Sequence, residues 1–94
     1  MESKTKLKNS LITYIEFIDQ TDTLVGHAWA TRHRARFVPK EGISIDWAAQ
    51  VALHIVQNYN IPVTMRFNSV KLKVPNNKQL TVQKIKDEYF DLSR

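Results

Sequence analysis

Apolar and polar residues alternate with a period of two over residues 63–67 and again over residues 70–74, which is the pattern of half-buried β-strands. The two residues between these segments suit a tight turn, because Asn68 tolerates the positive φ of a type I′ turn. Such a turn pairs Phe67 with Val70 and places the apolar side chains of both segments on one face. The sequence therefore predicts an antiparallel β-hairpin.

A helix is predicted before this hairpin. Trp47, Val51 and Ile55 recur at intervals of four residues, which is helical spacing. Ser44 precedes them in the position of an N-cap. We expect the helix to reach about Asn58 and to be closed there by an asparagine in the left-handed conformation, either Asn58 itself or the asparagine two residues later.

Helical spacing also marks the two ends of the chain. Near the C-terminus, Thr81 is the expected N-cap of a helix that turns Ile85 and Tyr89 inward. Near the N-terminus, apolar residues recur at i, i+4, i+7, i+8 and i+11 and predict a helix over residues 5–19. The residues of this stripe are Leu7, Leu11, Tyr14, Ile15 and Ile18.

Residues 24–38 fit two interpretations. As a helix they place Ala28 and Trp29 on an apolar face, and a helix to about Ala35 is the preferred expectation. As a strand they place three arginines on one side of the chain, because strand side chains alternate. These arginines are Arg32, Arg34 and Arg36. Pro39 ends the element in either case.

The expected fold is a small single α+β domain covering residues 1–94, with three to four helices packed on an antiparallel β-hairpin. The expected order of elements is α, α or β, α, β, β, α. A hairpin alone is marginally stable, so its apolar face must pack on the helices, and residues 24–37 would add a third strand if they are not helical. The expected core consists of Leu11, Ile15, Ile18, Trp47, Val51, Ile55, Val63, Met65, Phe67, Leu72, Ile85 and Tyr89.

The composition is that of an ordinary folded domain. Of 94 residues, 43% are hydrophobic and 24% are charged, which argues against intrinsic disorder. No apolar run approaches the ~20 residues of a membrane-spanning helix, and the charged first residues lack the apolar segment of a signal peptide. The absence of cysteine excludes disulfides and thiolate chemistry, although it is compatible with any compartment. We expect a cytoplasmic protein with no membrane partner.

Charge is the feature that points to a partner. The formal net charge is +5, and residues 23–40 and 61–86 contain no acidic residue. Arginine forks match phosphate oxygens, so clustered cations of this kind are typical of proteins that bind the backbone of DNA or RNA. The candidate phosphate-binding residues are Arg32, Arg34, Arg36, Lys40, Arg66, Lys71 and Lys73.

Ordinary explanations compete with this interpretation. Many small domains are basic for solubility alone, and lysine on an edge strand prevents aggregation. The arginines could instead pair with acidic residues elsewhere in the domain, namely Glu16, Asp19, Glu41 or Asp46. Trp29 and Trp47 occupy apolar positions, so we expect them in the core and not as platforms for stacked bases. Phe90 is also expected in the core.

The sequence offers no catalytic site. His27, His33 and His54 lack the spacing of metal ligands, and no nucleophile, base and orienting group can be nominated together. Neither glycine belongs to a phosphate-cradling loop; Gly26 is expected at a close-packing site and Gly42 in a turn. We therefore expect no enzymatic activity, no metal and no cofactor.

The helix–strand–strand–helix order of residues 44–91 resembles that of double-stranded-RNA-binding domains. That family has three strands between its helices, whereas two are expected here, and its basic cluster is matched only in part by Lys78, Lys84 and Lys86. The leading hypothesis is a small non-enzymatic module that binds DNA or RNA phosphates. The alternative is a protein-binding module or inhibitor that docks on an acidic partner, with its hairpin edge extending the partner's sheet. A homodimer formed through the same hairpin edge is a further expectation.

Overall fold

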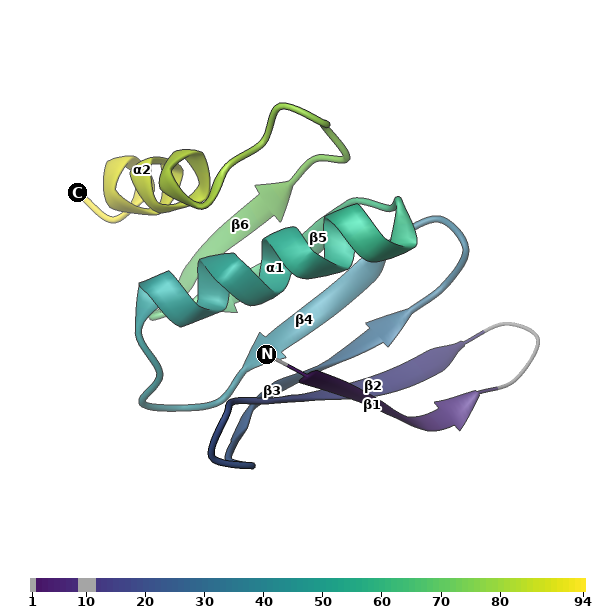
Figure 1. Cartoon of the computed structure of the whole chain (residues 1–94). Coiled ribbons are helices and arrows are strands. Elements are labelled where there is room, and N and C mark those ends of the chain that lie inside the picture. Colours follow the sequence, from purple (N-terminus) through teal and green to yellow (C-terminus); the bar gives the residue numbers. More distant parts are fainter. Residues whose placement is uncertain (1, 9–11) are drawn as a thin grey trace.

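The computed structural model describes the backbone of residues 2–8 and the whole of residues 12–94, which form six strands and two helices (Figure 1). In chain order these are β1 (Glu2–Lys8), β2 (Thr13–Ile18), β3 (Leu24–Ala30), β4 (Ala35–Pro39), α1 (Ile45–Tyr59), β5 (Val63–Phe67), β6 (Val70–Val74) and α2 (Val82–Leu92). All six strands belong to one sheet in the order β1-β2-β3-β4-β5-β6. The fold is therefore α+β with a mixed sheet.

The sheet consists of two parts, an antiparallel meander and a hairpin. Strands β1 to β4 form an antiparallel meander in which each strand pairs with the one before it. Helix α1 then carries the chain back along the sheet, so that β5 pairs with β4 in parallel and β6 closes an antiparallel hairpin with β5. The parallel pair joins the two halves of the molecule, because residues 35–37 lie against residues 63–65.

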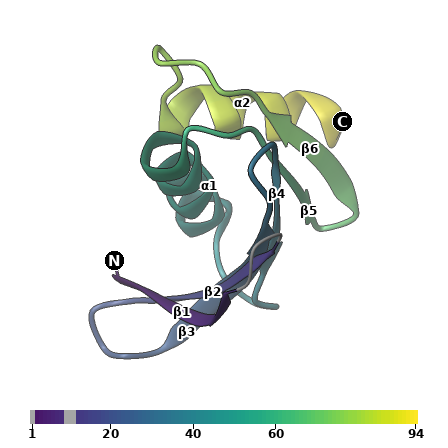
Figure 2. The same ribbon diagram turned by 90° about the vertical axis from the view of Figure 1, so that its right-hand side faces the viewer.

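Both helices pack on the same face of the sheet. Helix α1 contacts β4, β5 and β6, and α2 contacts α1 and β6. Figure 2 shows α1 in the angle between β1–β3 and β4–β6, with no helix on the opposite side of the sheet. The core therefore lies between α1, α2 and one sheet face, and its largest fully buried side chains are Phe17, Phe37, Ile15, Ile55, Leu72, Val51 and Val63.

The helices and the hairpin predicted for residues 44–91 are confirmed. The hairpin has the expected register, with Phe67 paired to Val70. Asn68 has φ 48° and the following serine φ 67°, as a type I′ turn requires. The Ser44 hydroxyl accepts a hydrogen bond from the Trp47 backbone N–H at 3.1 Å, and Asn60 closes α1 in the left-handed conformation with φ 56°. Thr81 likewise caps α2.

The expectation of three to four helices on a hairpin is wrong, and the first cause is residues 5–19. Of these, residues 5–8 and 13–18 lie in strands and not in a helix. Ile15 and Phe17 are both fully buried, two residues apart, as strand positions on one face must be. A register irregularity between Phe17 and Ile18 then turns Ile18 inward as well. That irregularity created the apparent helical spacing of Ile15 and Ile18.

The preferred helix over residues 24–35 is wrong for a different reason. The segment is two strands joined by a turn at residues 31–34. Thr31 organises this turn: its N–H donates to the Arg34 carbonyl oxygen at 2.9 Å, and its hydroxyl accepts from the N–H groups of His33 and Arg34. The strand interpretation gave the correct type of element. The turn, however, breaks the alternation of side chains, so that Arg32, Arg34 and Arg36 do not share one side of a single strand.

The predicted core is largely confirmed. Trp47 is only half-buried, Phe90 is 47% exposed on α2, and Leu11 lies outside the described residues. The other predicted core residues are buried. Trp29 is not in the core either; its side chain is 44% exposed.

Gly26 on β3 lies against the ring of Phe37 on β4. A Cβ atom at this position would lie 2.6 Å from Phe37 Cε1 and 2.7 Å from the Val38 carbonyl oxygen, far inside van der Waals contact. The glycine therefore lets a large aromatic ring sit directly on the backbone of the neighbouring strand, which confirms its expected role in close packing.

We predict that Gly26→Ala lowers the free energy of unfolding by about 1–3 kcal/mol, because the added methyl group must displace Phe37 or the backbone of β4. Urea denaturation followed by circular dichroism measures this change. Combined with Phe37→Leu, the substitution should cost less than the sum of the two single changes, since the smaller side chain relieves the clash. Strict additivity would contradict this account.

Candidate functional site

The sheet face opposite the helices is the candidate site. Among residues 12–94 it carries ten side chains that are exposed or half-buried, and we call this surface the open face. Its members are Tyr14, Glu16, His27, Trp29, Arg36, Val38, Thr64, Arg66, Lys71 and Lys73. Each alternates along its strand with a residue buried in the core, so the pleat of the sheet decides the membership of this surface.

Strand register aligns five of these residues in one row across the sheet. Tyr14 on β2 pairs with Trp29 on β3, and Trp29 pairs with Arg36 on β4. Arg36 pairs with Thr64 on β5, and Thr64 with Lys73 on β6. Because neighbouring strands lie ~4.8 Å apart, the row is about 19 Å long. One end of it is aromatic and the other is cationic.

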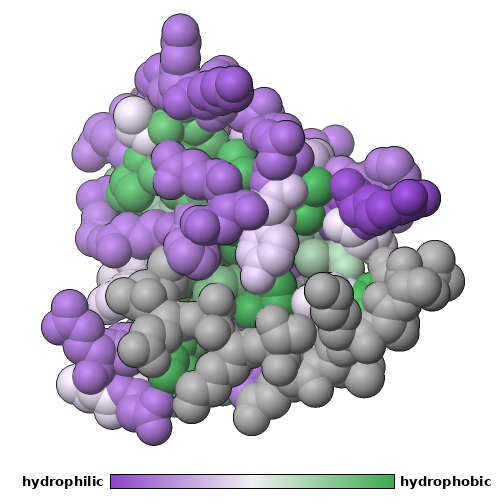
Figure 3. Space-filling model, turned by 45° about the vertical axis from the view of Figure 1, so that its right-hand side comes forward, coloured by the Kyte–Doolittle hydropathy of each residue, from purple (hydrophilic) through white to green (hydrophobic). Residues whose placement is uncertain are grey.

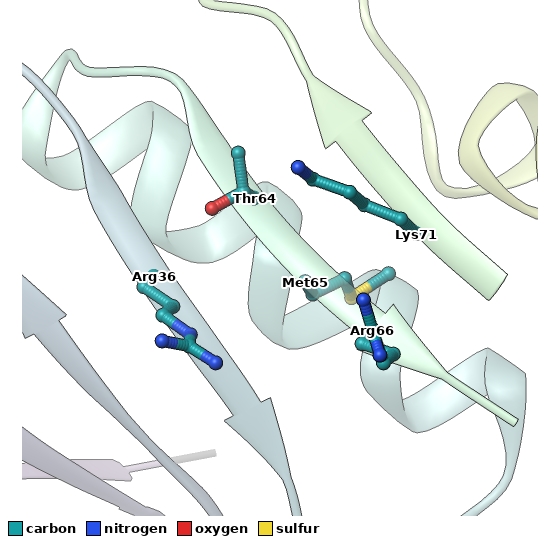
Figure 4. Close-up of a pocket in the computed structure, with 5 residues that line it drawn as sticks. All are labelled: Arg36, Thr64, Met65, Arg66 and Lys71. Carbon is teal, nitrogen blue, oxygen red and sulfur yellow. The ribbon is translucent and has the colours of Figure 1, made fainter. Parts of the chain in front are cut away.

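The cationic end is formed by Arg36, Arg66, Lys71 and Lys73, which we call the cationic strip. Arg66 pairs in register with Lys71, and this pair lies two residues along the hairpin from the Thr64–Lys73 pair of the row. An open hollow of about 300 Å³ lies among the first three of these residues and Thr64. Figure 4 shows their side chains around it, contributed by three neighbouring strands. The hollow brings residues from distant parts of the chain to one place.

The charges of the cationic strip have no acidic counterpart in the described part of the chain. The ion pairs found there join Lys86 to Asp46 at 3.0 Å and Arg94 to Asp91 at 3.6 Å, and all four of these residues belong to the helices or the C-terminus. The Lys86 ammonium group, with the Gln50 amide, lowers the pKa of Asp46. Pairing with acidic residues therefore does not account for the strip.

Protection of a sheet edge accounts for only half of the strip. Lys71 and Lys73 lie on β6, the last strand of the sheet, where lysine is an ordinary defence against edge pairing. Arg36 and Arg66 lie on β4 and β5, which have a neighbour on each side. No edge exists there to protect, so these two exposed arginines need another explanation.

The remaining predicted cations lie outside the strip. Arg32 and Arg34 are exposed in the turn between β3 and β4, before the strand that carries Arg36. Of these three arginines, only Arg36 lies beside the hairpin, because β4 pairs with β5.

Lys40 lies just beyond the other end of β4, where it lines a second hollow with Arg66. Its charge is partly engaged by Asp19. The pKa of Asp19 is lowered chiefly by hydrogen bonds from the Thr21 hydroxyl and the Thr23 backbone N–H, and to a smaller extent by Lys40. Lys40 is thus a neighbour of the strip and not a member of it.

The aromatic end of the row was missed by sequence reasoning. The Tyr14 and Trp29 rings lie 4.6 Å apart between centroids, and the His27 ring lies 5.5 Å from Tyr14. A signal was available: along β3 the small residues Gly26, Ala28 and Ala30 alternate with bulky ones, and here the small residues face the core. The usual assumption that the larger apolar side chain points inward hid this arrangement.

His54, on α1, lies on the helical side and does not join the open face. Its ring meets Phe17 edge-on at 6.1 Å, and burial lowers its pKa below the ordinary value. Within residues 2–8 and 12–94, no group of three His, Cys, Asp or Glu residues could hold a metal ion. No helix in this part of the chain has the length and apolar character needed to cross a membrane.

Comparisons of this chain with protein-family models, with curated proteins and with solved structures found no match. The order α1-β5-β6-α2 follows the order seen in double-stranded-RNA-binding domains, but only two strands separate the helices, and β5 continues into a larger sheet through β4. The chemistry of the open face is therefore the feature that bears on function.

Proposed function

We propose that this protein is a small, non-enzymatic, cytoplasmic module that binds nucleic acid through contacts between the cationic strip and backbone phosphates. The observation that carries the proposal is the exposure of Arg36 and Arg66 on central strands, without an acidic partner among the described residues. Exposed, unpaired guanidinium groups are suited to bidentate contacts with phosphate oxygens. Among residues 12–94, no ion pair or edge-protection role competes for these two arginines.

The dimensions of the strip support the same proposal. Arg36 and Lys73 are separated by two strand intervals, about 10 Å, and Arg66 lies two residues along β5 from the row, about 7 Å. Four cations thus share a patch the size of a few nucleotides. The acidic residues of the helices, Asp46, Asp87, Glu88 and Asp91, lie on elements that pack on the other side of the sheet. A polyanion approaching the cationic strip therefore meets four positive charges, whereas the acidic residue of the open face, Glu16, lies on β2 toward the aromatic end.

Titration of fluorescein-labelled DNA and RNA strands with the protein tests this proposal. Four neutralised phosphates predict a slope of about −3 when the logarithm of the binding constant is plotted against that of the salt concentration. Affinity should then fall about 50-fold between about 50 and 200 mM salt. Failure to bind any DNA or RNA, single-stranded or duplex, at the lower salt concentration would reject the proposal.

A second candidate function rests on the edge of the sheet. Strand β6 pairs with β5 only, so within the described residues its outer edge has no neighbouring strand. An acidic partner protein, or a second copy of this chain in a homodimer, could extend the sheet there, and the protein would then act as a protein-binding module or inhibitor.

Figure 3 shows one face of the molecule, and the hydrophobic residues among its coloured side chains lie in patches that hydrophilic residues interrupt. This face therefore adds little support to the second candidate. Sedimentation at several protein concentrations tests for the homodimer. A monomer throughout, combined with salt-dependent binding of nucleic acid, would leave nucleic acid as the preferred partner.

A further inference from the structure

We infer that the open face takes single-stranded nucleic acid, with a base stacked on Trp29 and the adjoining phosphates held by the cationic strip. This inference rests on the proposed function and adds the class of nucleic acid to it. Its starting point is the juxtaposition, by strand register, of an exposed indole with a row of cations.

The position of Trp29 is not explained by packing alone. Its side chain is 44% exposed although β3 is a central strand of the sheet. The contact with Tyr14, at 4.6 Å between ring centroids, is a cross-strand aromatic pair and supports one side of the indole. A large aromatic surface nevertheless stays in water on a rigid strand. Stacking of a ligand on this surface therefore costs the protein little side-chain entropy.

The neighbour of Trp29 has the chemistry of a phosphate site. Arg36 is its partner in register on β4, so the two side chains leave the sheet about 5 Å apart on the same face. A nucleotide whose base stacks on the indole can thus reach the guanidinium with its own phosphate. Thr64 and Lys73 continue the row for about 10 Å beyond Arg36, which gives the following phosphates hydroxyl and ammonium donors.

The combination of stacking surface and cations favours a single strand over a duplex. In a duplex the faces of the bases are stacked on one another and unavailable to an indole, whereas every base of a single strand presents a π-face. Recognition of a duplex groove uses a helix or a β-ribbon that enters the groove. Both helices of this protein lie behind the sheet, and the open face is the surface of a continuous sheet.

Binding of strands of about 12 nucleotides to the wild type and to Trp29→Ala tests the inference. We expect the wild type to bind single strands about tenfold more tightly than a duplex of the same sequence, and Trp29→Ala to lose about tenfold in affinity for single strands only. Trp29→Phe should keep most of the affinity because a ring remains. Tyr59→Ala, which removes another exposed aromatic side chain from the end of α1, should change nothing.

A direct readout of stacking does not depend on a truncated side chain. In Trp47→Phe, Trp29 is the one remaining tryptophan of the sequence. Single-stranded DNA or RNA should quench its fluorescence, whereas inorganic polyphosphate, which has the charge but no bases, should not. Equal quenching by both, or none by either, would overturn the inference.

The outcomes separate this inference from the proposed function. If single strands and duplexes bind equally well with a steep salt dependence, and Trp29→Ala changes neither, the inference fails and the proposed function stands. If no nucleic acid binds at low salt, both fail. Preference for RNA over DNA, or the reverse, would support the inference as long as Trp29 emission responds to the preferred strand.

Discussion

Replacing Arg66, Lys71 and Lys73 together by alanine is expected to weaken nucleic-acid binding by about 100-fold at about 50 mM salt. Each lost phosphate contact removes about 1 kcal/mol, and each 1.4 kcal/mol is a factor of ten in affinity. The slope of binding against salt should fall by about two units, since each contact contributes about 0.7 for a single strand. Labelled-oligonucleotide titrations at several salt concentrations measure both quantities.

The matched control for this variant keeps the overall charge equal. Lys78→Ala/Lys84→Ala/Arg94→Ala also removes two lysines and one arginine, so that both variants lower the net charge from +5 to +2 (5 − 3 = 2). These three residues are exposed in the loop before α2, on α2 and at the C-terminus. The control should retain most of the affinity. Equal losses in the two variants would mean that total charge, and not the cationic strip, governs binding.

Phe37→Ala is expected to lower the free energy of unfolding by about 3–5 kcal/mol. The side chain is 1% exposed, meets Phe17 edge-on at 5.9 Å between ring centroids and covers Gly26, so that its removal leaves a cavity between β3 and β4. A folded chain of 94 residues has about 5–14 kcal/mol of stability in total, and this one substitution removes a large share of it. Chemical denaturation at neutral pH measures the loss.

An exposed phenylalanine provides the comparison. Phe90 on α2 is 47% exposed, and Phe90→Ala should change the free energy of unfolding by less than about 1 kcal/mol. If Phe37→Ala were as mild as this, the ring of Phe37 would not lie in the core. The placement of β4 between β3 and β5 would then be wrong.

The half of the fold that sequence reasoning predicted correctly is the half with local signals. Ser44, Thr81 and Asn60 each mark a helix end through contacts within four residues. Asn68 marks the hairpin turn in the same way. In the first half, local contacts such as those of Thr31 mark a turn but do not decide the elements beside it. Whether residues 13–18 are helix or strand depends on pairing with β3, and the parallel pairing of β4 with β5 depends on the path of α1. Long-range pairing of this kind leaves no local pattern.

The site was predictable to a similar extent. The exposure of Arg66, Lys71 and Lys73 followed from strand alternation in the hairpin. That Arg36 joins them followed from no local rule, because the pairing of β4 with β5 was unknown. Trp29 was placed in the core on the general tendency of tryptophan to be buried, whereas the small residues beside it decide which way β3 faces.

The parallel pairing of β4 with β5 means that a bound nucleic-acid strand would hold the two halves of the sheet together. Trp29 and Arg36 lie on one side of this junction, and the other three cations lie on the other side. Any partial opening of the molecule between the meander and the hairpin would separate the two groups. A nucleic acid that contacts both groups binds only when β4 and β5 are paired and therefore stabilises this pairing. The protection of β4 and β5 against local unfolding should then increase as more of the protein is bound to nucleic acid.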